Sequence, residues 1–261
     1  MLSTGEWTTI AVPKLRSLPR PVFLRSQNLA PHERFPLHTH DWNQFVYATS
    51  GTLTVTVLRS RYVITPEQAI WVPAGVLHTT GTFSGAEFRN LYVTDSPDLG
   101  MPDRCTVYAV SGLLRALIAE LDRIDGQSET DAYLGKLNDL MVEQLRRLAE
   151  QDFHLPWPQR VQLRRLCETL YDNPADTRSL DDWGKELGAS GRTLARHFEK
   201  EMGITLREWR YKLRLFLALE WLGAGRNVTE IALDLGYAST SAFTYMFRRE
   251  MGCPPSEWRG G

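Results

Sequence analysis

The sequence has few cysteines, almost no net charge and no long apolar run. Its three cysteines, Cys105, Cys167 and Cys253, are far apart, which excludes a disulfide framework and a closely spaced cysteine metal site. No run reaches the ~18 apolar residues of a membrane-spanning helix, and the first residues lack a basic start followed by an apolar core. We therefore expect a chain that is neither exported nor membrane-bound and that resides in the reducing cytoplasm.

Apolar residues and a local basic excess are present. With 261 residues, 43% of them hydrophobic, the chain is long enough for two domains with cores of their own. The net charge is −1, but the charges are unevenly distributed: residues 190–214 include seven basic and three acidic residues. That excess would suit a polyanion such as nucleic acid, although a solvated helix face is the commoner cause of such runs.

The hydrophobic pattern changes twice along the chain. Short alternating stretches from Pro21 to about Val93, such as TLTVTVL at 52–58, predict a β-sandwich or barrel without intervening helices. Helical spacing follows from Ser111 to Gln151, and the stretch DFHLPWPQ reads as a linker. We thus predict an α+β chain of two domains, divided into a β domain at 1–107, a helical pair at 108–151, a linker at 152–159 and an all-α domain at 160–261.

The helical pair is predicted from two amphipathic stripes. Leucine, isoleucine and methionine recur every three or four residues in both, as expected for two helices that pack together. The stripes are Leu113, Leu114, Leu117, Ile118 and Leu121, and Leu134, Leu137, Met141, Leu145 and Leu148.

An internal repeat occupies the last hundred residues. GASGRTLARHFEKEMG from Gly188 aligns with YASTSAFTYMFRREMG from Tyr237 at a spacing of 49. Each copy has a short helix (180–187 and 229–235), a glycine in a tight turn, a serine in capping position and a second helix that ends in Met-Gly. This order is typical of a helix-turn-helix unit.

One long helix is predicted between the two units. Thr205 and Glu208 form a capping box at its start, and Gly223 and Gly225 mark its end. Such a helix would hold the two units at a fixed separation, as needed if both second helices enter successive major grooves about 34 Å apart.

The first recognition helix is expected to bury Leu194 and Phe198. Arginine has a planar fork that fits the two acceptors of a guanine edge, whereas lysine suits phosphate. The residues left facing outward are Arg192, Thr193, Arg196 and Lys200.

The second recognition helix is expected to bury Phe243 and Phe247. Its outward side is less charged, with Thr240, Ser241, Thr244, Tyr245 and Arg248 as DNA-contacting candidates. Ser190 and Ser239 are expected to cap their helices, with any phosphate contact secondary.

The C-terminal hundred residues resemble the AraC-type DNA-binding domain. The run IALDLGYASTSAFTYMFRREMGCPPSEWR contains the family's glycine, phenylalanines and Gly-x-x-Pro-x-x-aromatic-Arg ending. The resemblance implies a transcription regulator with base-contacting positions at Arg192, Arg196, Ser241 and Tyr245. Packing of Tyr245 against its own domain remains an alternative.

Two further motifs, HTHDWNQFVYATSG and PAGVLH, contain three histidines. Residues two apart on a strand share a face, so His38 and His40 would point together, and Gln44, four further on, would join them. With His78, the motifs resemble those of the cupin fold, and the resemblance implies metal ligation by these four residues. Gln44 stands where the family usually has Glu. A divalent transition metal, which imidazoles suit, and a metal-free pocket that binds an anionic ligand are both open.

These features together predict a DNA-binding transcription regulator controlled by a small molecule or a metal in the cupin-like domain. The family architecture implies a homodimer through 108–151, operator or promoter DNA as partner and RNA polymerase as a further candidate partner. The alternative is a metal-dependent cupin oxygenase or isomerase with an open metal position. That alternative leaves the repeated helical half without a purpose, and Asp41, the carboxylate of the motif, is expected to point away from the histidines. We therefore predict that the chain is not an enzyme.

Overall fold

A computed structural model describes residues 7–12, 15–57, 59–66, 68–124, 132–151 and 154–258, and these form two compact units. The first unit comprises the described residues up to 57 and from 64 to 151. The second comprises residues 59–63 and 154–258. Leu58, residues 152 and 153 of the expected linker and Arg259 of the expected C-terminal motif lie outside the described residues.

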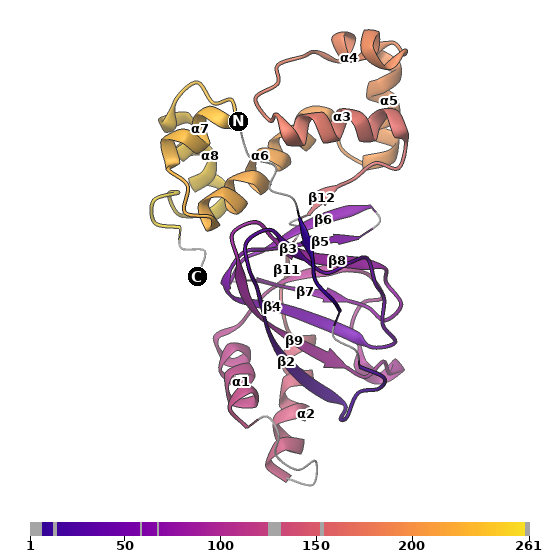
Figure 1. Ribbon diagram of the computed structural model, residues 1–261, viewed down its shortest axis with the longest axis vertical. Coiled ribbons are helices and arrows are strands. Elements are labelled where there is room, and N and C mark those ends of the chain that lie inside the picture. The colour runs from indigo at the N-terminus through magenta and orange to yellow at the C-terminus, as the bar shows by residue number, and fades with distance from the viewer. Residues whose placement is uncertain are drawn as a thin grey trace. The chain divides into compact units, whose positions relative to one another are not determined.

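Two antiparallel sheets build the first unit, as the alternating pattern predicts (Figure 1). One sheet has the order β11-β10-β7-β4-β9-β2, and in the other β1, β3, β8 and β5 follow one another, with β1 and β3 parallel. The strands are β1 (Thr8–Thr9), β2 (Val22–Leu29), β3 (Glu33–Arg34), β4 (Asn43–Gly51), β5 (Leu53–Val57), β7 (Gln68–Val72), β8 (His78–Thr82), β9 (Ala86–Val93), β10 (Thr106–Ala109) and β11 (Glu150–Gln151).

Gly51 ends β4 at a position that only glycine fits. Its φ is +70°, and a Cβ there would lie 2.2 Å from the carbonyl oxygen of Gly85. The left-handed backbone and this close approach together explain the glycine that follows Gln44 in the histidine motif. Gly51 is paired with Ala86 at the end of the ladder between β4 and β9, and β9 supplies another side chain of the candidate site.

Helices α1 (Gly112–Arg123) and α2 (Ala132–Arg146) cover the sheet that contains β2 and β9, below the strands in Figure 1. A short 3₁₀ turn, η1 (Pro97–Leu99), precedes them. Leu114, Ile118 and Met141 are buried against sheet residues such as Trp71 and Leu91, in one hydrophobic core. The expected contact between the two helices is confirmed. Their apolar stripes face the sheet, with the exception of Leu113, which is 49% exposed.

The end of the expected helical pair is wrong. Residues 150 and 151 form β11, which pairs with β10, because the backbone after α2 completes an edge of the sheet. Part of the expected linker is also structured. Within the second unit, β12 (Leu155–Pro156) pairs with Arg61 and Ser60 at the start of β6 (Ser60–Ile64), and Trp157 donates its backbone N–H to the Arg59 carbonyl at 2.8 Å.

Aromatic side chains hold this segment in the second unit. The Arg61 guanidinium lies 3.6 Å from the centre of the Trp157 ring and 4.8 Å from that of Tyr171. The Tyr171 hydroxyl donates to the buried Glu220 carboxylate at 3.2 Å. The prolines around Trp157 thus introduce a packed extended segment, since the tryptophan is 9% exposed.

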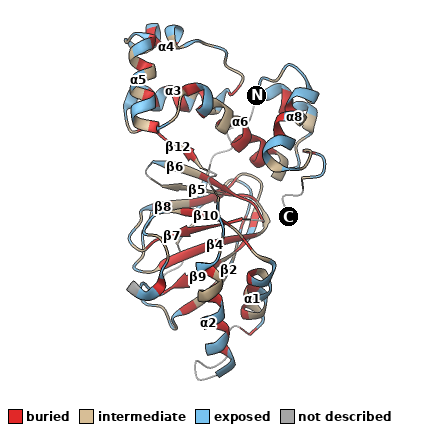
Figure 2. Ribbon diagram, turned by 180° about the vertical axis from the view of Figure 1, so that it is seen from behind, coloured by how far each residue is buried: buried red, intermediate tan, exposed pale blue. Residues whose placement is uncertain are grey.

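Six helices complete the second unit. They are α3 (Val161–Asp172), α4 (Leu180–Leu187), α5 (Gly191–Met202), α6 (Leu206–Gly223), α7 (Val228–Asp234) and α8 (Thr240–Met251). Helix α6 lies between the group α3–α5 and the pair α7–α8 (Figure 1), and it is buried along most of its length (Figure 2). The Thr205 and Glu208 capping box at its start is confirmed.

Both predicted helix-turn-helix units are present. Gly188 ends α4 in the left-handed conformation, Ser190 caps α5, and Gly203 ends it. In the second unit Ser239 caps α8 and Gly252 ends it. The α4–α5 turn also needs Gly184, where a Cβ would lie 2.4 Å from the Ala189 carbonyl oxygen.

Two further expectations concern the surroundings of the chain. Among the described residues, no helix is both long and apolar enough to span a bilayer. Cys105, Cys167 and Cys253 are all free thiols, as their spacing predicts, and burial raises the pKa of Cys105 to about 11.

Candidate functional site

The structure brings the three predicted histidines together. His78 begins β8 and is fully buried, and His38 pairs with it through an isolated β-bridge whose two N–H···O bonds are 3.0 and 2.9 Å. The ring centres of His38 and His40 lie 4.4 and 5.1 Å from that of His78. One ligand atom from each histidine lies within 4.8 Å of the others, so the three rings share one site.

The predicted strand position of His38 and His40 is wrong. His38 and His40 were predicted on one strand face, but β4 begins only at Asn43. The histidines sit in the loop before it, and pairing of that loop with β8 creates the cluster.

Backbone carbonyls fix the tautomer of each histidine. The Nδ1–H groups of His38 and His78 donate to the carbonyls of Pro36 and Val76, both at 2.9 Å. The His40 Nδ1–H donates to the Trp42 carbonyl at 2.6 Å. With Nδ1 protonated in each ring, Nε2 carries the lone pair. All three rings are thereby left with Nε2 as the nitrogen that could bind a metal, the arrangement found around protein-bound metals.

Burial favours the neutral forms of His78 and His38. It lowers the pKa of His78 to about 4, and the nearby His38 and His40 contribute to that shift. Burial is also the main reason that the pKa of His38 is lowered. The Nε2 atom of His78 is buried and has no hydrogen-bond partner among the described residues. An acceptor in that condition is costly unless something binds it.

Gln44 joins the cluster as predicted, through its side-chain carbonyl. Its Oε1 lies 2.8 Å from His40 Nε2, and its Nε2 donates to Asn90 Oδ1 at 2.7 Å. Asn90 on β9 in turn donates to Gln27 on β2. Sequence reasoning missed Asn90 and Gln27, because neither belongs to a motif and the strand register that brings them to Gln44 cannot be read from the sequence.

Aromatic rings line the same region. Trp42 stacks on His40 with an interplanar angle of 3° and a centre distance of 5.4 Å, and Tyr92 lies 5.7 Å from Trp42. Asp41 is exposed and is not a member of the histidine cluster. The site therefore offers neutral nitrogen and amide donors beside aromatic walls.

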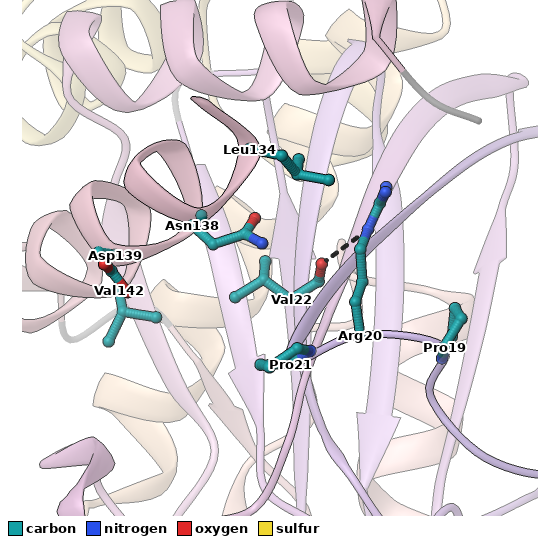
Figure 3. Close-up of a pocket in the computed structure, with 9 residues that line it drawn as sticks. Pro19, Arg20, Pro21, Val22, Leu134, Asn138, Asp139 and Val142 are labelled. Carbon is teal, nitrogen blue, oxygen red and sulfur yellow. Dashed lines mark hydrogen bonds between the residues drawn. The ribbon is translucent and has the colours of Figure 1, made fainter. Parts of the chain in front are cut away.

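A hollow of about 310 Å³ lies away from the histidines, between the chain that leads into β2 and helix α2 (Figure 3). Its walls are Pro19, Arg20, Pro21, Val22, Leu134, Gly135, Asn138, Asp139 and Val142. The Oδ1 atom of Asn138 is buried and has no hydrogen-bond partner among the described residues. The volume of this hollow is at the lower end for a small-molecule pocket. None of the predicted site residues lines the hollow.

The first recognition helix, α5, presents the predicted cations. Leu194 and Phe198 are buried, as expected, and Arg192, Arg196 and Lys200 are exposed. Within the described part of the chain, none of these three cations forms an ion pair. Ser190 accepts the Thr193 N–H at 3.2 Å and lies 2.8 Å from its hydroxyl, so its oxygen is used as a cap.

The second recognition helix, α8, buries Phe243 and Phe247 and exposes a less charged side. Tyr245 is 71% exposed, so it does not pack into the domain. The other candidates are exposed or half-buried: Thr240, Ser241, Thr244 and Arg248. The structure thus places all the predicted DNA-contacting side chains of α5 and α8 at least partly at the surface.

Comparison with known proteins agrees with both motifs. A helix-turn-helix domain model matches residues 183–261, and a cupin domain model matches residues 25–93. The chain is 31% identical to the HTH-type transcriptional regulator NimR of Escherichia coli over 85% of this chain and 81% of that protein. It is 25% identical to the HTH-type transcriptional activator RhaS of Escherichia coli over 88% of this chain and 90% of that protein.

Among solved structures, that of ToxT from Vibrio cholerae O395 aligns with 91% of this chain and 96% of its own, at 14% identity and a TM-score of 0.37. The extended identity with NimR, together with the two domain matches, decides the family. The chain belongs to the AraC-type helix-turn-helix transcriptional regulators that have an N-terminal cupin domain.

Proposed function

We propose that this regulator binds operator or promoter DNA through α5 and α8. The observation that carries the proposal is the exposed face of α5, where Arg192, Arg196 and Lys200 are free of ion pairs with described residues. An exposed cation without a partner can neutralise phosphate or reach a base edge at no cost in broken ion pairs. Arg192 and Arg196 are the proposed base readers, and Lys200 is the proposed phosphate contact.

Helix α8 is proposed to contact DNA with hydroxyl groups and with Arg248. Thr240, Ser241 and Thr244 offer short hydrogen-bonding side chains, and Tyr245 adds a phenol. The N-termini of both helices, with Ser190 and Thr193 on α5, would approach the phosphate backbone. RNA polymerase is proposed as a further partner of the bound regulator, and the cytoplasm as the place where it acts.

The test is a footprint on the DNA upstream of the protein's own gene. Two protected patches on one face, about 10 base pairs apart, are expected for wild type. The double variant Arg192→Ala/Arg196→Ala should lose both patches and keep weak binding to unrelated DNA. Arg147→Ala on α2, where Arg147 is paired with Glu143, removes one positive charge elsewhere and is the control. Equal losses on operator and unrelated DNA would contradict a reading role.

We further propose that the cupin domain binds a divalent transition metal at His38, His40 and His78. The residues fit such an ion because three Nε2 lone pairs converge and that of His78 is buried without a partner. Imidazole donors suit Zn, Cu, Fe or Ni. When bound, the metal would supply a Lewis-acidic position open to a small effector, since the protein donors are neutral and leave its charge uncompensated.

Elemental analysis of the untagged protein tests the metal site. Stoichiometric metal in wild type, lost in His38→Ala and in His78→Ala, is the expected result. His197→Ala, which removes a half-buried histidine of the second unit, should retain the metal. Protein that is metal-free after purification and after incubation with Zn²⁺, Fe²⁺ or Ni²⁺ would contradict the proposal.

An effector that binds the cupin domain is proposed to act by favouring one arrangement of the two domains over another.

A homodimer through the outer faces of α1 and α2 is proposed as the assembly. The inner stripes pack on the sheet, but Leu113 and Leu140 are 49% and 42% exposed. Sedimentation should show a dimer that Leu140→Glu weakens. Val161→Glu changes an apolar residue of α3 that is 77% exposed and serves as a matched control.

We propose that the chain is not an enzyme. A cupin oxygenase or isomerase would need an acid or base at the metal, and Asp41 of the motif is exposed and outside the histidine cluster. Turnover of any bound effector would revive the enzymatic alternative.

A further inference from the structure

Three buried or half-buried amides cross three neighbouring strands toward the histidines. Gln27 on β2, Asn90 on β9 and Gln44 on β4 lie on one diagonal of the sheet, because Asn90 is opposite Val46 and Arg25 in the strand register. Side chains on such a diagonal face the same side and are within reach of one another. Asn90 and Gln44 are 2% and 5% exposed, so both amides are shielded from bulk solvent.

The hydrogen bonds along this diagonal have a direction. Asn90 donates from Nδ2 to Gln27 Oε1 and accepts the Gln44 Nε2–H at Oδ1. Gln44 is thereby left with its carbonyl toward His40. Turning the Gln44 amide over would set its Oε1 against Asn90 Oδ1, and two acceptors in contact repel each other.

This orientation is unusual for an amide beside a neutral histidine. His40 donates from Nδ1 to the Trp42 carbonyl, so in a neutral ring its Nε2 would be an acceptor. Gln44 Oε1, which can only accept, nevertheless lies at hydrogen-bond distance from that nitrogen, at 2.8 Å. The contact therefore requires a cation on His40 Nε2, either a proton or a metal ion. A glutamine free to rotate would present its NH₂ group to such a nitrogen. The observed orientation, with the Gln44 carbonyl toward the ring, lets His40 Nε2 and Gln44 Oε1 bind the same cation.

We propose that Asn90, with Gln27 behind it, is the positioning residue that holds Gln44 Oε1 toward the histidines as the fourth donor to a metal ion. The inference rests on the proposed metal site. It gives a reason why an amide can stand where a carboxylate is usual: a carboxylate accepts with either oxygen, whereas an amide must be oriented by its neighbours. Asn90 does not contact the metal in this proposal and acts only through Gln44.

Cobalt(II) is a suitable probe, because its visible absorption reports the donor set. The untagged full-length protein is stripped with a chelator and titrated with Co²⁺ at neutral pH. Loss of an outer-shell partner typically costs about 10- to 100-fold in metal affinity. Asn90→Leu should therefore bind Co²⁺ about 10- to 100-fold more weakly and with a changed visible spectrum. Gln44→Leu should give the same changed spectrum as Asn90→Leu. Gln27→Leu should change the spectrum in the same direction but by less.

A double-mutant cycle separates positioning from general damage. If Asn90 acts only through Gln44, then Asn90→Leu should have no further effect in the Gln44→Leu background. Gln68→Leu removes another buried amide, on β7, that does not touch this diagonal, and it should leave the cobalt spectrum unchanged. Asn90→Asp keeps the acceptor for Gln44 and should restore much of the wild-type spectrum. It also serves as the informative variant if Asn90→Leu does not fold.

The outcomes distinguish this inference from the proposal beneath it. Wild-type protein that binds no stoichiometric Co²⁺ would overturn the metal site and the inference together. Wild-type protein that binds Co²⁺ at His38, His40 and His78, with an Asn90→Leu variant of unchanged spectrum and affinity, would overturn the role of Asn90 alone. Additive losses in the double variant would likewise show that Asn90 does not act through Gln44.

Discussion

The two recognition helices are copies in backbone but differ in how many cations they hold on the outward face. A residue of α5 and the residue 49 positions later on α8 occupy the same place, and positions four apart lie on one helix face. Three such positions face outward on α5, and all three hold exposed cations. The matched pairs are Arg192 and Ser241, Arg196 and Tyr245, and Lys200 and Arg249.

The one cation that α8 has on this face is already engaged. Arg249 forms an ion pair with Glu250 at 3.0 Å and donates to the Tyr211 hydroxyl at 2.6 Å. Lys200, its counterpart on α5, has no ion pair within the described chain. The two copies thus share their caps and buried residues, whereas the residues at the exposed positions determine which DNA contacts each helix can make. Most of the electrostatic attraction to DNA should come from α5.

The largest effects should come from substitutions of buried residues that the two copies share. Phe198 and Phe247 are both fully buried at equivalent places, and truncation of a buried phenylalanine costs about 3–5 kcal/mol. Phe198→Ala and Phe247→Ala should therefore lower the free energy of unfolding by similar amounts in urea titrations. Leu233→Ala, at a residue of α7 that is 61% exposed, should change it by less than about 0.5 kcal/mol. A much smaller cost for one phenylalanine would break the equivalence of the two copies.

The two helix-turn-helix copies could be predicted from the sequence because their signals are local. The caps Ser190 and Ser239, the glycines after the helices and the buried phenylalanines all lie within a few residues of the turns that they define. Periodicity also gave the buried sides of α1 and α2. What it did not give was the two-residue strand β11, since that strand exists only through its pairing with β10.

The candidate metal site was predicted only in part, for a related reason. The motifs identified His38, His40, Gln44 and His78, but not the β-bridge between His38 and His78 that joins them. Asn90 lies 46 residues from Gln44 in the sequence, and only the register of β4 with β9 makes them neighbours. Side chains that act through strand register leave no trace in a single sequence.

A smaller effect should separate the two helices in base reading. Arg196→Ala should weaken binding to the operator by about 1–3 kcal/mol, the value of one good arginine–guanine contact. Arg196→Lys should not restore it, because lysine lacks the planar fork. Tyr245→Ala, at the matching position of α8, should cost less than Arg196→Ala. Fluorescence anisotropy at one fixed salt concentration, with operator and scrambled duplexes, measures all three. A larger loss for Tyr245→Ala would make α8 the principal reader.

The smallest effect should appear in the salt dependence of binding. Each phosphate that a protein cation neutralises contributes about 0.9 to the slope of log K against log salt. Lys200→Ala should therefore lower the slope by about 0.9 with little change in sequence preference. Arg249→Ala should lower it by less, because its guanidinium already faces the Glu250 carboxylate and displaces fewer counterions from DNA. Equal changes in slope would mean that Arg249 exchanges Glu250 for phosphate on binding, and the two helices would then be alike in their electrostatic contribution despite their different surfaces.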